Sequence, residues 1–128
     1  MSARFIPFLG AFASAALLTL VGCGGGKPTE ATCPTGSTLT YSNFGQTFMG
    51  TYCLRCHNEA LTGAARKDAP ADVNFNTLAE IIKEKKDIDE NAGASASVTN
   101  TEMPPDGDKP SLDDRKKLAE WLACGAPQ

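Results

Sequence analysis

The five residues C-x-x-C-H at positions 53–57 constrain this chain more than any other feature of its sequence. They include Cys53, Cys56 and His57, and His57 is the only histidine among the 128 residues. Two thiols and an imidazole at this spacing serve three known chemistries: a redox-active dithiol, a zinc site or the covalent attachment of haem. The remainder of the chain has to distinguish between them.

Zinc and redox-dithiol chemistry fit the rest of the sequence poorly. A zinc site usually needs four ligands, and outside the motif the chain offers no further histidine. A thioredoxin-like dithiol lies between a strand and a helix, whereas this motif closes a predicted helix. Haem attachment fits, because thiols at this spacing can bond to the two vinyl groups of one porphyrin while the adjacent imidazole reaches the iron. We therefore expect one haem c, bonded to Cys53 and Cys56, with His57 as its proximal iron ligand.

Met103 is the expected second axial ligand of the iron. The chain has no second histidine, and methionine is the other common ligand of electron-transfer haems. Met49 lies one turn before Cys53 on the same predicted helix, too close to reach the opposite face of the haem. Met103 lies far downstream of His57, in a loop that the two following prolines restrict. The alternative is that Met103 is a packing or surface side chain.

Residues 1–22 have the pattern of a bacterial secretory signal. One basic residue precedes an apolar run that is short for a membrane span and contains Pro7. Leu-Val-Gly-Cys at 20–23 resembles the bacterial lipobox, which implies that Cys23 is lipidated and begins the mature chain. We expect export to the periplasmic side of a bacterial membrane, a lipid anchor at Cys23, and a flexible tether over residues 23–40.

The composition of the expected mature chain narrows its partners and its core. Without Arg4, 11 basic and 15 acidic side chains remain, a net charge of −4, so we expect no nucleic-acid partner. Three of the six phenylalanines also lie in the signal. A domain this small with few aromatic residues often needs a cofactor or a cross-link for stability.

Three helical patterns follow one another within the predicted domain, residues 41–128, and no stretch alternates for long enough to indicate a strand. The candidate caps are Ser42, Thr77 with Glu80, and Ser111 with Asp114. The apolar faces contain Phe44, Phe48 and Tyr52, then Leu78, Ile81, Ile82 and Ile88 toward Asn91, and finally Leu118, Trp121 and Leu122. Loops at 58–74 and 93–110 flank the C-x-x-C-H motif. We predict an all-α fold of about three main helices, with long loops that wrap the haem.

The stretch from Tyr41 to Pro127 resembles a class I, single-haem c-type cytochrome. The residues that carry the resemblance are C-x-x-C-H, M-P-P at 103–105 and the aromatic residue of the last helix, Trp121. "TYCLRCH" and "LAEWLACGAP" are most similar to the small single-haem lipoprotein cytochromes of myxobacteria and their relatives. The resemblance implies a cytochrome c-like fold over 41–128.

The same resemblance implies two particular contacts. The first and last helices of that family cross with a glycine and an aromatic residue at the contact, and the matching positions here are Gly45, Phe48, Leu118 and Trp121. The family also places a proline carbonyl on Nδ1 of the haem histidine, which orients the ring and raises its basicity. Pro70 is the matching candidate.

Two cysteines, Cys33 and Cys124, remain after Cys23 and the two haem cysteines are assigned. In an oxidising compartment we expect them to form a disulfide that joins the tether to the end of the last helix. Two free thiols are the alternative.

These expectations describe a membrane-anchored one-electron carrier, not an enzyme. With His57 and Met103 both on the iron, a substrate has no place on the metal, and the partners would be other redox proteins that bind transiently. Two alternatives stay open. If Met103 does not ligate, the chain would be a haem enzyme or gas sensor with an open distal site; it could also be the haem-bearing subunit of a larger respiratory complex.

Overall fold

A computed structural model describes residues 25–128, so the expected signal, residues 1–22, and the lipidation candidate Cys23 lie outside the described residues. The described part of the chain is helical, and its only β pairing is an isolated bridge between Ala94 and Thr99. The predicted all-α class is confirmed. No helix within 25–128 has the length and apolar character needed to cross a membrane.

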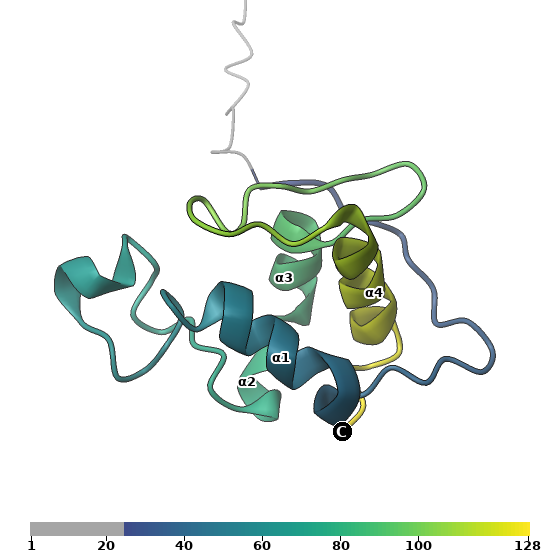
Figure 1. Cartoon of the computed structure of the whole chain (residues 1–128), viewed down its shortest axis with the longest axis horizontal. Coiled ribbons are helices and arrows are strands. Elements are labelled where there is room, and N and C mark those ends of the chain that lie inside the picture. The colour runs from purple at the N-terminus through teal and green to yellow at the C-terminus, as the bar shows by residue number, and fades with distance from the viewer. Residues whose placement is uncertain (1–24) are drawn as a thin grey trace, which may run out of the picture.

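The helices lie together, and the long loops run along the outside of them (Figure 1). In chain order they are η1 (Tyr41–Gly45), α1 (Gln46–Phe48), η2 (Met49–Cys53), η3 (Gly63–Arg66), α2 (Leu78–Lys83), α3 (Lys85–Ala92) and α4 (Leu112–Ala123). η1, α1 and η2 follow one another without a break, and η1 and η2 are π-helical. The 58–74 loop, which contains η3, projects from one side, while the 93–110 loop passes over the ends of α3 and α4 (Figure 1). These two loops are where the sequence pattern predicted them.

The first helix begins two residues earlier than the sequence pattern predicted. Its N-cap is Thr40, whose side chain accepts a hydrogen bond from the Asn43 N–H, while the Asn43 side chain accepts one from the Thr40 N–H. Thr40 has the extended backbone that an N-cap requires, with φ −132° and ψ 167°. Ser42 lies inside η1, so its prediction as the cap was wrong.

The caps predicted for the other helices are confirmed. Thr77 and Glu80 form the reciprocal capping box at the start of α2, and the Ser111 side chain accepts a hydrogen bond from the Asp114 N–H at the start of α4. The predicted second helix is nevertheless divided into α2 and α3 at Glu84, where φ is −98° and ψ is 10°.

The division at Glu84 changes which isoleucines are buried. Ile81 and Ile88 lie in the core, as their spacing predicts. Ile82 was predicted on the same apolar face, but it is 40% exposed. α2 ends one residue after Ile82, and the turn at Glu84 separates its face from that of α3. The apolar stripe is therefore continuous in the sequence but not in space.

The core lies where the first helical run meets α4. Trp121 and Leu118 have no exposed side-chain surface. A Cβ atom on Gly45 would lie 2.5 Å from Cζ2 of Trp121, so only glycine allows this approach. The ring centroids of Tyr41 and Phe44 lie 6.4 Å and 6.2 Å from that of Trp121. The glycine–aromatic contact between the first and last helices is therefore present.

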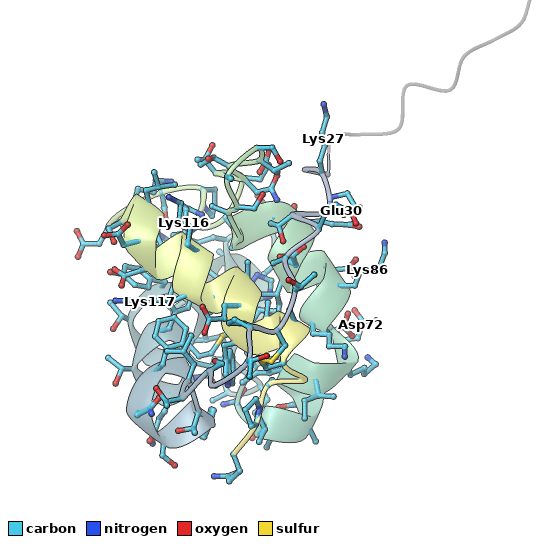
Figure 2. The ribbon with its side chains drawn as sticks, turned by 90° about the vertical axis from the view of Figure 1, so that its right-hand side faces the viewer. Lys27, Glu30, Asp72, Lys86, Lys116 and Lys117 are labelled. Atoms are coloured by element: carbon cyan, nitrogen blue, oxygen red, sulfur yellow. A yellow bond between two sulfur atoms is a disulfide. The ribbon has the colours of Figure 1, made fainter. Side chains whose placement is uncertain are left out.

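Residues 25–40 lie against the domain. The backbone N–H and the hydroxyl of Thr29 both donate to the Asp89 carboxylate, at 2.9 Å and 2.7 Å. The Asn100 side chain bonds both the N–H and the carbonyl of Lys27, at 3.1 Å and 2.7 Å. Figure 2 shows Lys27 and Glu30 on this segment. The backbone groups of Lys27 and Thr29 thus have partners in the domain, while the flexible tether expected over residues 23–40 stays a prediction.

A disulfide completes this attachment. Cys33 is bonded to Cys124, the residue that follows α4. The predicted pairing is confirmed, and the N-terminal segment is covalently joined to the C-terminal end of the domain.

Candidate cofactor site

One cavity brings together the residues that the sequence singled out. It has a volume of about 460 Å³, and its lining includes Cys53, Cys56, His57 and Met103. This volume lies within the roughly 300–1,000 Å³ that ligand sites usually occupy. The apolar part of its wall includes Phe48, Val73, Phe75, Ile88, Pro104 and Pro105. Met103 thus shares a cavity with a motif from which it is far removed in the sequence.

A tight turn after η2 presents the C-x-x-C-H motif to the cavity. The N–H groups of Cys56 and His57 both donate to the carbonyl of Cys53, at 3.1 Å and 2.9 Å. Cys56 is buried, Cys53 is half-buried, and neither forms a disulfide. Both thiols and the imidazole therefore reach the same space as reduced, separate groups.

The environment of Cys53 does not favour thiolate chemistry. Burial raises the pKa of its thiol to about 12, although the charge of Arg55 acts in the opposite direction. Redox-active and metal-binding cysteines depend on thiolates, whose pKa is lowered rather than raised. Among residues 25–128, no group of three or more histidine, cysteine, aspartate or glutamate side chains could hold a metal ion.

The imidazole of His57 is oriented by a backbone carbonyl. Its Nδ1 lies 3.1 Å from the carbonyl oxygen of Val73, and its ring packs on Phe75 with centroids 4.7 Å apart. Because Nδ1 faces this acceptor, Nε2 is the nitrogen that remains for a metal. Burial is the largest influence on the pKa of His57 and lowers it, which favours the neutral ring that a ligand requires.

The carbonyl at Nδ1 is not the one that the resemblance implied. The expected group was Pro70, but the Pro70 carbonyl accepts a hydrogen bond from the Arg66 guanidinium instead. Val73, three residues later, faces His57. The reason is that Arg66 draws the Pro70 end of the loop to itself, and the turn that follows brings Val73 to the imidazole.

Arg66 organises the 58–74 loop from within. Its side chain is buried and donates to the carbonyls of Asn58, Ala69 and Val73 at 2.7 Å, 3.1 Å and 2.9 Å. It also donates to Oδ1 of Asn74 at 2.9 Å. The Val73 carbonyl thus serves both Arg66 and His57. The sequence did not predict this role for Arg66, because the backbone carbonyls that it bonds carry no periodic or motif signal.

The backbone of Met103 is held from two sides. Its N–H donates to the carbonyl of Asn91 at 2.9 Å, and its carbonyl accepts from the Arg115 guanidinium at 2.9 Å. The Met103 side chain lines the cavity but is 39% exposed. The position of the thioether therefore depends in part on how the loop is held.

Ion pairs connect the two loops beside the cavity. The Asp106 carboxylate lies 2.6 Å from Nζ of Lys67 and 3.6 Å from the guanidinium of Arg55. The hydrogen bond from Lys67 is the largest influence on the pKa of Asp106 and lowers it. One carboxylate from the 93–110 loop thus contacts both the 58–74 loop and the C-x-x-C-H motif.

No protein-family model, curated protein or solved structure matches this chain. Whether a cofactor fits is therefore judged from the candidate ligands in the cavity. Two free thiols in C-x-x-C spacing, an oriented imidazole, a thioether and apolar walls share one cavity. These residues fit a covalently attached haem, for which histidine and methionine are common axial ligands.

Proposed function

We propose that this chain is a single-haem c-type cytochrome with a cytochrome c-like fold, which carries one electron at a time. The observation that supports the proposal best is that Met103 lines the same cavity as Cys53, Cys56 and His57. A zinc site or a redox dithiol would have no use for a thioether in this cavity. A haem ligated by one histidine and one methionine needs one.

Each residue then has a defined task. The thiols of Cys53 and Cys56 would hold the porphyrin through thioether bonds, and His57 and Met103 would ligate the iron. When bound, the haem supplies an iron that changes between ferric and ferrous. The chain orients the imidazole through Val73 and surrounds the group with apolar side chains, an environment in which histidine–methionine ligation raises the reduction potential. Because both axial positions are taken by side chains, this site transfers electrons and does not bind a substrate at the metal.

Location and partners are part of the same proposal. The signal pattern and the lipobox-like Leu-Val-Gly-Cys support export and a lipid anchor at Cys23 on the periplasmic side of a bacterial membrane. The confirmed disulfide between Cys33 and Cys124 supports an oxidising compartment. The partners would be other redox proteins that bind transiently.

Covalent haem attachment tests the proposal directly. The full chain is produced in a bacterium that matures c-type cytochromes, and haem is detected on denaturing gels and quantified per chain. We expect one haem per chain in the wild type and none that survives denaturation in Cys53→Ala/Cys56→Ala. The matched control is Cys33→Ser/Cys124→Ser, which removes two other cysteines, those of the disulfide, and should retain the haem. A wild-type chain without covalent haem would overturn the proposal.

A further inference from the structure

Arg115 is the most deeply buried charged side chain near the candidate site, with 3% of its surface exposed. Among the residues that the structure describes, it has no ion-pair partner. Nη1 of its guanidinium donates to the backbone carbonyls of Ala92, Asn100 and Met103 at 2.9 Å, 2.8 Å and 2.9 Å, so its two hydrogens are shared among three acceptors. Burying a cation is unfavourable unless hydrogen bonds satisfy it, so these three carbonyls are what keep Arg115 inside.

The three acceptors have one feature in common. Ala92 is the last residue of α3, while Asn100 and Met103 lie in the loop that leads from α3 to α4. A single guanidinium on α4 is therefore hydrogen-bonded to both the start and the middle of this loop. The backbone carbonyl of Arg115 adds a further bond to the same loop, because it accepts from the Ala94 N–H at 3.1 Å.

The bond to Met103 bears on the candidate haem ligand. The Met103 N–H is already bonded to the end of α3, so the bond from Arg115 restrains the other side of the same residue. Met103 is 39% exposed, so surrounding side chains cover it only in part. These two backbone bonds therefore contribute to fixing its direction into the cavity.

We infer that Arg115 is a positioning residue that holds Met103 on the haem iron by fixing the Met103 carbonyl to α4. The inference rests on the proposed haem site. Arg115 acts through the backbone of Met103 and needs no contact with the cofactor. Without it, the backbone of Met103 keeps only its bond to Asn91, so the thioether can move away from the iron although Asn100 and Asp106 still hold other parts of the 93–110 loop.

The experiment compares Arg115→Gln and Arg115→Lys with the control Lys116→Gln in the haem-loaded full chain. Lys116 is the next residue of α4 and points outward from the helix (Figure 2), so its variant also loses one charge without touching the loop. The readouts are the far-red charge-transfer band of methionine-ligated ferric haem, carbon monoxide binding by the ferrous protein, and helix content by circular dichroism. Band and helix content are followed together as the temperature rises.

We expect Arg115→Gln to retain haem and helix content but to lose the band, with at least a tenfold gain in carbon monoxide affinity. Arg115→Lys should restore part of the band, because lysine keeps the charge and three donors. Lys116→Gln should match the wild type. If Arg115→Gln does not accumulate as folded protein, Arg115→Lys is used in its place. Loss of its far-red band at a temperature well below that at which its helices unfold would support the inference.

Two contrary results are distinguishable. Arg115 variants that keep a wild-type band up to the temperature of helix unfolding would overturn the inference and leave the proposed function intact. A wild-type protein that carries covalent haem but lacks the band would remove Met103 from the iron, and the inference would fall with that part of the proposed function.

Discussion

At the scale of single residues, two buried arginines organise the two sides of the candidate site. Arg66 bonds the carbonyls of the loop that presents Val73 to His57, and Arg115 bonds those of the loop that presents Met103. Charged hydrogen bonds of this kind are stronger than neutral ones, and breaking one leaves a buried group unsatisfied. The 58–74 and 93–110 loops are held in defined positions in this way.

A comparison with Met49 tests whether the effects of replacing a methionine are specific to Met103. Met49 is a second methionine, with 1% of its surface exposed, and it does not line the cavity. In haem-loaded protein we expect Met103→Leu to abolish the far-red band, lower the reduction potential and open the ferrous iron to carbon monoxide. Met49→Leu conserves core volume, should cost less than about 1.5 kcal/mol of stability, and should leave all three properties unchanged.

If Met103→Leu behaves like the wild type in absorption and potential, Met103 is not an axial ligand. A wild-type protein that already binds carbon monoxide readily would then favour the haem enzyme or gas sensor over the electron carrier.

At the scale of elements, the close contact between the first helical run and α4 is possible because Gly45 has no side chain. Figure 1 shows the start of the run beside the C-terminal end of α4, where Gly45 faces Trp121. The Trp121 ring has no exposed surface, and its Nε1 donates to the Pro127 carbonyl at 3.2 Å. The ring therefore has little freedom to move away from a larger residue.

Gly45→Ala should lower the free energy of unfolding by about 1–3 kcal/mol, because the new Cβ atom would overlap the Trp121 ring. Gly50→Ala in the same helical run is the matched control, since nothing lies within 4 Å of its Cβ position. That control should raise stability by about 0.5–1 kcal/mol through helix propensity. Urea unfolding followed by circular dichroism measures both. Equal effects at the two positions would mean that the helix contact is not close-packed.

At the scale of the whole molecule, the two ends of the described chain are tied to the domain. The disulfide between Cys33 and Cys124 spans 91 residues, and hydrogen bonds to the Asp89 carboxylate and with the Asn100 side chain hold the segment that precedes it. Long loops and a small core make such cross-links valuable, because they restrict the unfolded chain more than the folded one.

Cys33→Ser/Cys124→Ser should therefore lower the free energy of unfolding by about 2–5 kcal/mol, toward the upper end because the closed loop is long. The measurement is urea unfolding of oxidised wild type and variant, with Thr32→Ser as a control at a neighbouring exposed position. An unchanged unfolding midpoint would show that the hydrogen bonds of residues 25–31 already hold the segment in place without the covalent bond.

Local rules account for what could be predicted from the sequence. The all-α class, the caps at Thr77 and Ser111, the two long loops and the pairing of the two spare cysteines follow from residue types a few positions apart or from a simple count. The motif at 53–57 likewise identifies its own candidate chemistry, because its three donors are adjacent in the chain.

The remaining features arise only when distant segments meet. Val73 rather than Pro70 faces His57, and Arg115 bonds the backbone of Met103. The acceptors in these contacts are backbone carbonyls, which every residue carries, so no residue type marks them in advance. The packing of residues 25–40 has the same origin, because its partners Asp89 and Asn100 are more than fifty positions away. The sequence by itself therefore identifies the candidate ligands of the site. Their arrangement around one cavity depends on long-range hydrogen bonds to backbone groups, which every residue has.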